Sequence, residues 1–270
     1  MEVSNSRIQL TGVAIYGWYL LNMILHIEYF SMLWGKDSWI RYDVRQSGLI
    51  ENLVYHLTYA PDHANAIIAI HIVCSALGMF LFRHVWFFRL LSWLTGWLLY
   101  YSAYYVFDSG YLLIQAFSFL LIFQRTGNTP LSIGINQMLT HALQVVLVMG
   151  YIASSAFKLS GHQWWEGTAF YYALHLEYLT GSSLVNVWWA NAPWVSKCLT
   201  WGSLLYQLLF PLMIYWRRYS VHWLILGIVF HLLTIVLFGL WGFAFAMLAG
   251  YCIFLPEKWA YRITLKAIHE

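Results

Sequence analysis

The stretch TGVAIYGWYLLNMILHIEYF, residues Thr11 to Phe30, decides the fold class of this chain. It has about the length that an α-helix needs to cross the hydrocarbon core of a bilayer, and its acidic residue, Glu28, lies near its end. No small-residue cleavage site follows the apolar run, so the pattern does not indicate a cleavable signal peptide. We therefore predict that this stretch is the first of several membrane helices.

The composition of the whole chain agrees with this interpretation. Of its 270 residues, 61% are hydrophobic and 9% are charged, whereas soluble domains carry about 25% charged residues. Aromatic residues make up 20%, which suits a protein with two belts of aromatic rings at the membrane interfaces. The net charge of +3 and the lack of a basic run argue against nucleic acid as a partner, and the three cysteines match no metal motif. The sequence thus predicts an all-α integral membrane protein whose partner is the lipid bilayer.

Apolar runs of similar length recur along the chain and predict a polytopic helical bundle of about eight transmembrane helices, within a range of about six to eight. The expected spans are residues 11–31, 64–82, 85–106, 109–124, 138–157, 195–216, 221–237 and 239–255. Two pairs of spans are separated only by short turns, which keeps the lower counts open. No soluble domain interrupts the pattern, so we expect residues 1–270 to form a single transmembrane domain.

The distribution of basic residues predicts the orientation of the bundle. If all eight spans cross the membrane, nine of the 14 Lys and Arg residues fall on the side of the two termini and five on the opposite side. Short connections that are rich in Lys and Arg usually face the cytoplasm. We therefore predict that both termini are cytoplasmic and that the long loops, 32–63 and 158–194, are extracytoplasmic.

Lys158 is the basic residue in the least ordinary place, at the non-cytoplasmic end of the fifth span. Tyr151, Ser155 and Lys158 are spaced i, i+4 and i+7, so they share one face of the helix. A lysine at this position can extend its amine to the interface and contact the last carbonyl groups of the helix. Alternatively, a partly desolvated lysine has a lowered pKa and can act as a base. The residues alone favour the first interpretation.

Other spans also carry polar residues that share a helix face. These are Tyr19, Asn22 and His26 in the first span, His71 and Ser75 in the second, and His231 and Thr234 in the seventh. Such stripes are typical either of an internal polar cavity or of hydrogen bonds between helices, and the sequence leaves both open. No pair of His and acidic residues in a span has the spacing of a zincin or di-iron site, so we expect no metal.

The segment around Lys158 suggests a family. It reads YIASSAFKLSGHQWWEGTAFYYAL from Tyr151 to Leu174 and resembles the core motif of the HTTM family, the membrane domain shared with vitamin K-dependent γ-carboxylase. In that family a helix ends in a lysine, the chain breaks, and W-x-x-G opens an interfacial helix, which is expected here near residues 164–179. Residues 210–218 and 230–243 are also similar to segments of the family.

The resemblance implies roles for particular residues. Lys158 would be the catalytic base, and His231 would stabilise or relay a proton in carboxylase-like or lyase-like chemistry. The residues that would bind a cofactor at the walls of the cavity are Trp164, Trp165, Gly167, Asp108 and Tyr111. The implied cofactor is a membrane quinol. The implied substrate is a secreted peptide, modified outside a bacterial inner membrane with the help of a companion membrane or periplasmic protein.

Two positions depart from the family. Ser109 stands where the carboxylase has a histidine, and Gln207 lies near the place where bacterial members often carry an acidic residue. Two further classes of function therefore stay open. One is a non-catalytic membrane scaffold, such as an export or immunity partner. The other is a quinone- or haem-associated electron-transfer subunit, which a bound chromophore would reveal.

Overall fold

The computed structural model describes residues 6–34, 48–49, 57, 61–80, 84–103, 107–176, 191–216 and 218–269. Within these residues it contains twelve α-helices, two short 3-10 helices and no strand. The prediction of an all-α chain is therefore confirmed.

Each of the eight predicted spans coincides with a helix. These helices are α1 (Ser6–Leu25), α4 (Pro61–Gly78), α5 (Val85–Ser102), α6 (Ser109–Ile122), α7 (Pro130–Leu159), α12 (Pro193–Met213), α13 (Ser220–Phe238) and α14 (Trp241–Tyr251). Three of them, α1, α7 and α13, are long and apolar enough to cross a membrane, while α4, α6 and α14 contain shorter apolar stretches. The structure thus supports candidate membrane spans, and the count of eight crossings stays a prediction.

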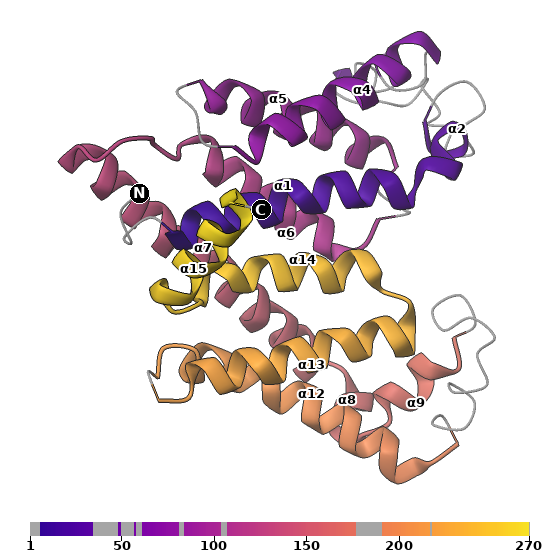
Figure 1. The fold of residues 1–270 in the computed structure, drawn as a ribbon. Coiled ribbons are helices and arrows are strands. Elements are labelled where there is room, and N and C mark those ends of the chain that lie inside the picture. Colours follow the sequence, from indigo (N-terminus) through magenta and orange to yellow (C-terminus); the bar gives the residue numbers. More distant parts are fainter. Residues whose placement is uncertain are drawn as a thin grey trace.

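The long helices are arranged around a central pair (Figure 1). Helices α1 and α14 pack against each other in the middle, with α4 and α5 beyond α1 and with α13 and α12 beyond α14. Helix α6 packs against α5 and α14, and α7 packs against α6 and α12. The largest cluster of buried apolar side chains draws on α1, α6, α7, α12 and α14, and includes Tyr16, Phe117, Leu143, Phe210 and Met247.

Six short elements complete the described chain. They are η2 (Ile27–Tyr29), α2 (Phe30–Leu33), α8 (His162–Glu166), α9 (Ala169–Leu174), η4 (Cys252–Phe254) and α15 (Glu257–His269). The expected interfacial helix near 164–179 is thus two helices, α8 and α9, as far as residue 176. Residues 177–190 of the second long loop, and most of the first long loop, 32–63, lie outside the described residues.

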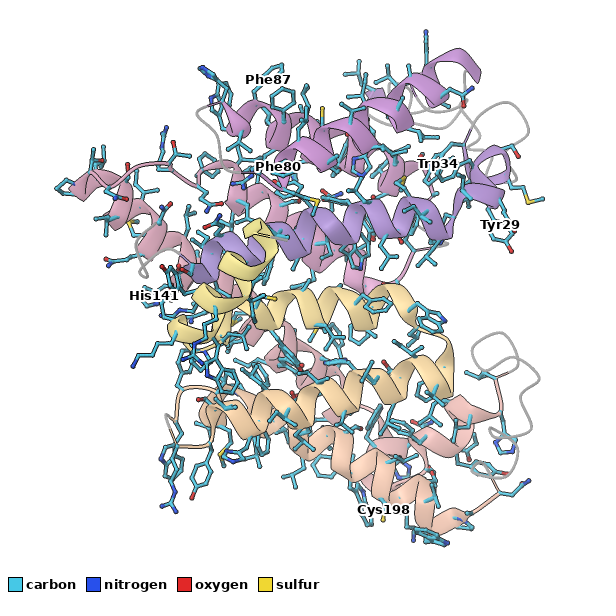
Figure 2. All side chains as sticks on the ribbon, viewed as in Figure 1. Tyr29, Trp34, Phe80, Phe87, His141 and Cys198 are labelled. Carbon is cyan, nitrogen blue, oxygen red and sulfur yellow. The ribbon has the colours of Figure 1, made fainter. Side chains whose placement is uncertain are left out.

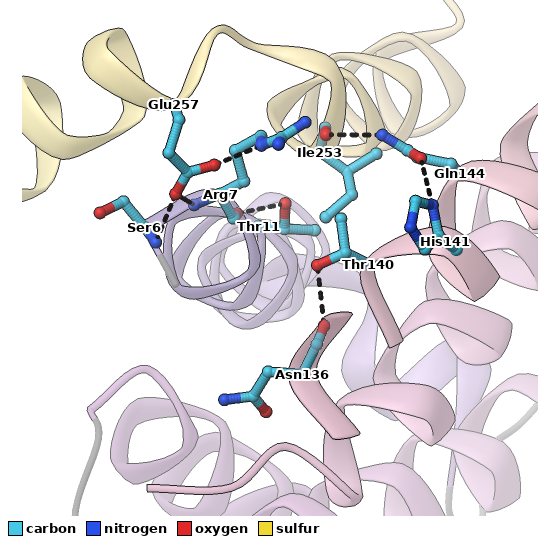
Figure 3. A network of polar contacts seen from close by, with 9 residues as sticks. All are labelled: Ser6, Arg7, Thr11, Asn136, Thr140, His141, Gln144, Ile253 and Glu257. Atoms are coloured by element: carbon cyan, nitrogen blue, oxygen red, sulfur yellow. Dashed lines mark hydrogen bonds and ion pairs between the residues drawn. The ribbon is translucent and has the colours of Figure 1, made fainter. Parts of the chain in front are cut away.

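Helix α15, which the sequence analysis did not predict, joins the two ends of the chain. The carboxylate of Glu257 accepts hydrogen bonds from the backbone N–H groups of Ser6 (2.8 Å) and Arg7 (3.2 Å), and it forms an ion pair with the Arg7 side chain. Figure 3 shows these contacts beside a second link, in which Gln144 of α7 donates to the Ile253 carbonyl. A carboxylate at a helix N-terminus is favourable because the free N–H groups carry partial positive charge. The start of α15 therefore lies beside the start of α1, at the end of the bundle opposite Lys158.

Arg89 is buried inside the bundle although it carries a charge. Its side chain is 1% exposed and lies between the last turns of α4 and α6. Nε donates to the Gly78 carbonyl (3.0 Å), and one terminal nitrogen donates to the Leu121 carbonyl (3.1 Å) and to Gln124 Oε1 (2.6 Å). The last carbonyl groups of a helix lack partners within the helix. One guanidinium therefore donates hydrogen bonds to carbonyl groups at the C-termini of two helices, α4 and α6.

Candidate functional site

Lys158 lies in the last turn of α7 and is held by uncharged groups. Its Nζ donates to Ser154 Oγ at 2.6 Å, and Ser154 Oγ donates to Oε1 of Gln207 on α12 at 3.1 Å. The ammonium also lies 5.1 Å from the centre of the Trp164 ring, within the range of a cation–π contact. Among the described residues, no carboxylate forms an ion pair with it. The amine is therefore partly buried and has no counter-ion in the described part of the chain.

The W-x-x-G segment forms a tight turn that packs against α12. Helix α8 ends at Gly167, which has a φ of +76°, in the left-handed region that favours glycine. The Gly167 carbonyl accepts a hydrogen bond from Ser196 Oγ of α12 at 3.1 Å. A β-carbon at this position would lie 2.9 Å from Lys197 Cγ and 3.1 Å from the Trp201 ring. This turn positions Trp164 over Lys158, whereas Trp165 is exposed and donates to the Leu159 carbonyl.

We expect the substitution Gly167→Ala to destabilise the fold by about 1–2 kcal/mol, because alanine is strained at a positive φ and its methyl group would be crowded against α12. The matched control is Gly134→Ala, within α7, where an added β-carbon would meet no atom within 4 Å. That control should be neutral or stabilising by up to about 1 kcal/mol. Thermal unfolding of both purified variants in the same detergent measures the difference. Equal unfolding temperatures would contradict the role given to Gly167.

His231 belongs to a buried hydrogen-bond network that four helices build. Its Nε2 is hydrogen-bonded to Tyr151 Oη of α7 at 2.8 Å. The hydroxyl groups of Tyr151 and Tyr251 are hydrogen-bonded to each other, and Tyr251 Oη also contacts Tyr206 Oη of α12 at 2.8 Å. Gly227 of α13 leaves the space that the two hydroxyl groups of Tyr206 and Tyr251 occupy. His231 is 1% exposed, and its Nδ1 has no partner among the described residues.

Lys158 and His231 do not contact each other, but both connect to the same face of α7. Tyr151, the partner of His231, precedes Lys158 by seven residues, which is about 10 Å along a helix. An apolar groove of about 300 Å³ between α12 and α13 is lined by neither residue, but it contacts a neighbour of each. Phe170 lines one end of it and packs edge-on against Trp164, while Tyr206 of the network lines the other end. Cys198, labelled in Figure 2, also lines this groove.

The structure does not bring Asp108 and Tyr111 together with Lys158. The Asp108 carboxylate caps the N-terminus of α6 by accepting from Gly110 N (2.9 Å) and also accepts from Phe243 N of α14 (2.8 Å). Tyr111 is fully buried and donates to the Gly96 carbonyl. The two residues line a separate cavity at the same end of the bundle, whose other walls come from the end of α1 and the turn from α13 to α14.

Sequence reasoning missed several members of these networks. Tyr206, Tyr251 and Gly227 were not singled out, and Ser154 was passed over in favour of Ser155, whose hydroxyl has no hydrogen-bond partner among the described residues. One usable signal was a tyrosine hydroxyl within an apolar span, because such a group needs a partner. The partners themselves depend on which helices are neighbours, and one sequence does not contain that information.

No group of three or more His, Cys, Asp or Glu side chains in the described part of the chain is placed to hold a metal ion. The two histidines that are buried among the described residues, His71 of α4 and His231 of α13, lie in separate networks, with α1 and α14 between their helices (Figure 1). Comparisons with known proteins gave no match: no protein-family model, no curated protein and no solved structure matches this chain.

Proposed function

We propose that this chain is an HTTM-like protein of a bacterial inner membrane that acts as a carboxylase-like catalyst, or maturation factor, on an extracytoplasmic peptide. In this proposal the chain crosses the membrane eight times, its termini are cytoplasmic, and Lys158 faces the outer side. The observation that carries the proposal is the surroundings of Lys158: a partly buried amine at a helix end, with no carboxylate partner among the described residues. Trp164 contacts this amine and packs on Phe170, which lines the apolar groove.

The groove between α12 and α13 suits a lipid-soluble quinol. Its walls are almost entirely apolar, and the polar atom of most interest is the Tyr206 hydroxyl, which the buried network holds in place. A quinol supplies a hydroxyl group that is acidic enough to lose a proton to an amine. Lys158, when neutral, can accept that proton, and Trp164 and Ser154 hold the resulting ammonium. The peptide would approach from the outer side of the membrane.

His231 and its tyrosines would support this chemistry from within the bundle. The four groups form a continuous chain from His231 Nε2 through Tyr151 and Tyr251 to the Tyr206 hydroxyl at the groove. Buried polar groups in a bilayer are costly, so a connected network is either a functional relay or a device that fixes helix pairing. We assign this network the role of a proton relay, because its last member, Tyr206, lines the groove.

A non-catalytic scaffold is the second candidate. The observation that favours it is the pairing of the other polar stripes: Ser75 with Ser92, Tyr19 with Ser118, and His71 with Thr95 are all hydrogen-bonded between helices. Such pairs hold a bundle together without chemistry. An electron-transfer subunit is the third candidate, and the visible absorption spectrum of the purified protein tests it.

The experiment that tests the catalytic proposal compares the secreted peptides of cells that produce this protein with those of cells that lack it. We expect at least one secreted peptide to differ in mass, with the change mapping to one of its side chains, as measured by tandem mass spectrometry. An unchanged set of secreted peptides, together with a haem or flavin band in the purified protein, would contradict the proposal and favour electron transfer.

A further inference from the structure

A second cavity, of about 470 Å³, lies at the Lys158 end of the bundle but apart from Lys158. The end of α1, the residues just before and at the start of α6, and the turn from α13 to α14 form its walls. Its lining includes Asp108, Asn22, His26, and aromatic side chains such as Trp18 and Trp241. Tyr29, labelled in Figure 2, is an exposed part of the lining at this end. The proposed function uses none of these residues.

Asp108 is the only acidic residue in the lining of this cavity among the described residues. Two backbone N–H groups, of Gly110 and Phe243, donate to its two oxygens. No Lys or Arg in the described chain forms an ion pair with it, and burial raises the pKa of its carboxyl group, while nearby His26 and the backbone hydrogen bonds lower it. The cavity thus holds a carboxyl group whose charged form is stabilised by backbone N–H groups and is paired with no Lys or Arg in the described chain.

Asn22 supplies a donor that has no partner. It is 4% exposed, lines the cavity, and its Nδ2 makes no hydrogen bond within the described chain. A buried N–H group without an acceptor costs about 1–3 kcal/mol. Nδ2 is itself buried, so an acceptor on a bound molecule would recover that free energy once the amide turns towards the cavity. The same cavity therefore lacks both a cation for Asp108 and an acceptor for Asn22.

Aromatic rings make up much of the remaining wall. Trp18, Tyr29, Phe107, Tyr111 and Trp241 all line the cavity. Aromatic faces attract ammonium groups, and sites that combine several rings with a carboxylate are suited to organic cations. A metal ion would instead need several strong ligands, and no group of three or more His, Cys, Asp or Glu side chains among the described residues is placed to hold one.

We propose that this cavity binds an ammonium group that stands next to a carbonyl group, as at the free N-terminus of a peptide. The ammonium pairs with Asp108 against the aromatic rings, and the adjacent carbonyl accepts from Asn22. Free amino-acid amides carry the same pair of groups, so they would bind through the same contacts. The binding is independent of any reaction at Lys158.

The test uses the full-length protein in lipid nanodiscs and isothermal titration with three probes. These are leucinamide, N-acetyl-leucinamide and a trileucine peptide with a free N-terminus. We expect the wild-type protein to bind at least one of the probes with a free amine and to bind the acetylated probe at least about tenfold more weakly, because acetylation removes the charge. Binding of trileucine alone assigns the site to peptides, and binding of leucinamide as well assigns it to amines in general; both outcomes support the proposal.

Three variants sharpen the test. Asp108→Asn and Trp241→Leu should each weaken binding of the free amine by about tenfold or more. Trp241 is exposed, so its variant remains informative if Asp108→Asn fails to fold. The control Glu28→Gln removes an exposed carboxylate near the same cavity, outside its lining, and should bind as the wild type does. Equal binding of the acetylated probe, no binding of either free amine, or unchanged binding by Trp241→Leu and a folded Asp108→Asn overturns the proposal.

Discussion

The substitution Lys158→Met is expected to abolish modification of the peptide substrate while leaving the protein folded. Loss of a general base typically reduces a rate by about 10²–10⁴-fold. Methionine keeps most of the apolar stem of the lysine, and Ser154 keeps its hydrogen bond to Gln207, so the stability should change by less than about 1 kcal/mol. The amount of modified peptide, measured by mass spectrometry and normalised to the amount of protein in the membrane, gives the result.

Two further variants separate a base from a positive charge. Lys158→Arg keeps the charge but stays protonated, so it should be as inactive as Lys158→Met if Lys158 acts as a base. Lys197→Met removes an exposed lysine at the same end of the bundle and should retain activity. Full activity in Lys158→Arg would show that only the charge matters, and full activity in a folded Lys158→Met would remove the catalytic proposal altogether.

The positions of the helices could be predicted from the sequence because bilayer thickness determines the length of an apolar run. All eight expected spans coincide with helices, with bounds that differ by up to eight residues, the largest difference being at the start of α7. The predicted shared face of Tyr151, Ser155 and Lys158 follows from helix geometry alone, and the structure has all three on α7. The sequence could not predict which face of each helix packs against which neighbouring helix, since hydropathy carries no information about helix pairing.

Asp108 and Gly167 show where sequence reasoning reaches its limit. The resemblance grouped Asp108 with Lys158, but the structure has Asp108 at the joint between α6 and α14, where its hydrogen bond to Phe243 N connects residues 135 positions apart. Gly167 was expected inside one interfacial helix, yet its left-handed backbone divides that segment into α8 and α9. Both outcomes depend on contacts with distant parts of the chain, and a single sequence does not reveal those contacts.

The second prediction with a large expected effect concerns Arg89. Replacing Arg89 with leucine should destabilise the protein by about 3–5 kcal/mol, enough to lower its amount in the membrane. The guanidinium supplies the donors for the Gly78 carbonyl, the Leu121 carbonyl and the Gln124 side chain. Without it, the Gly78 carbonyl and Gln124 Oε1 would lack a donor among the described residues, and the Leu121 carbonyl would keep only the Gln124 N–H (3.2 Å). Each buried acceptor without a donor costs about 1–3 kcal/mol. The unfolding temperature of the purified variant, and its yield in the membrane, measure the effect.

The same argument predicts a graded series. Arg89→Lys should lie between the wild type and Arg89→Leu, because an ammonium can donate three hydrogen bonds but cannot match the planar geometry that reaches both helix ends. Arg125→Leu is the matched control, since that side chain is exposed and Asn136 contacts only its backbone; we expect a change within about 0.5 kcal/mol. If Arg89→Leu unfolds at the temperature of this control, Arg89 does not hold the ends of α4 and α6 together. If Arg89→Leu unfolds at a temperature far below that of the control, the buried Arg89 is a structural element of the bundle. It has no acidic partner in the described chain, because carbonyl groups at helix ends supply the negative charge that a carboxylate would otherwise provide.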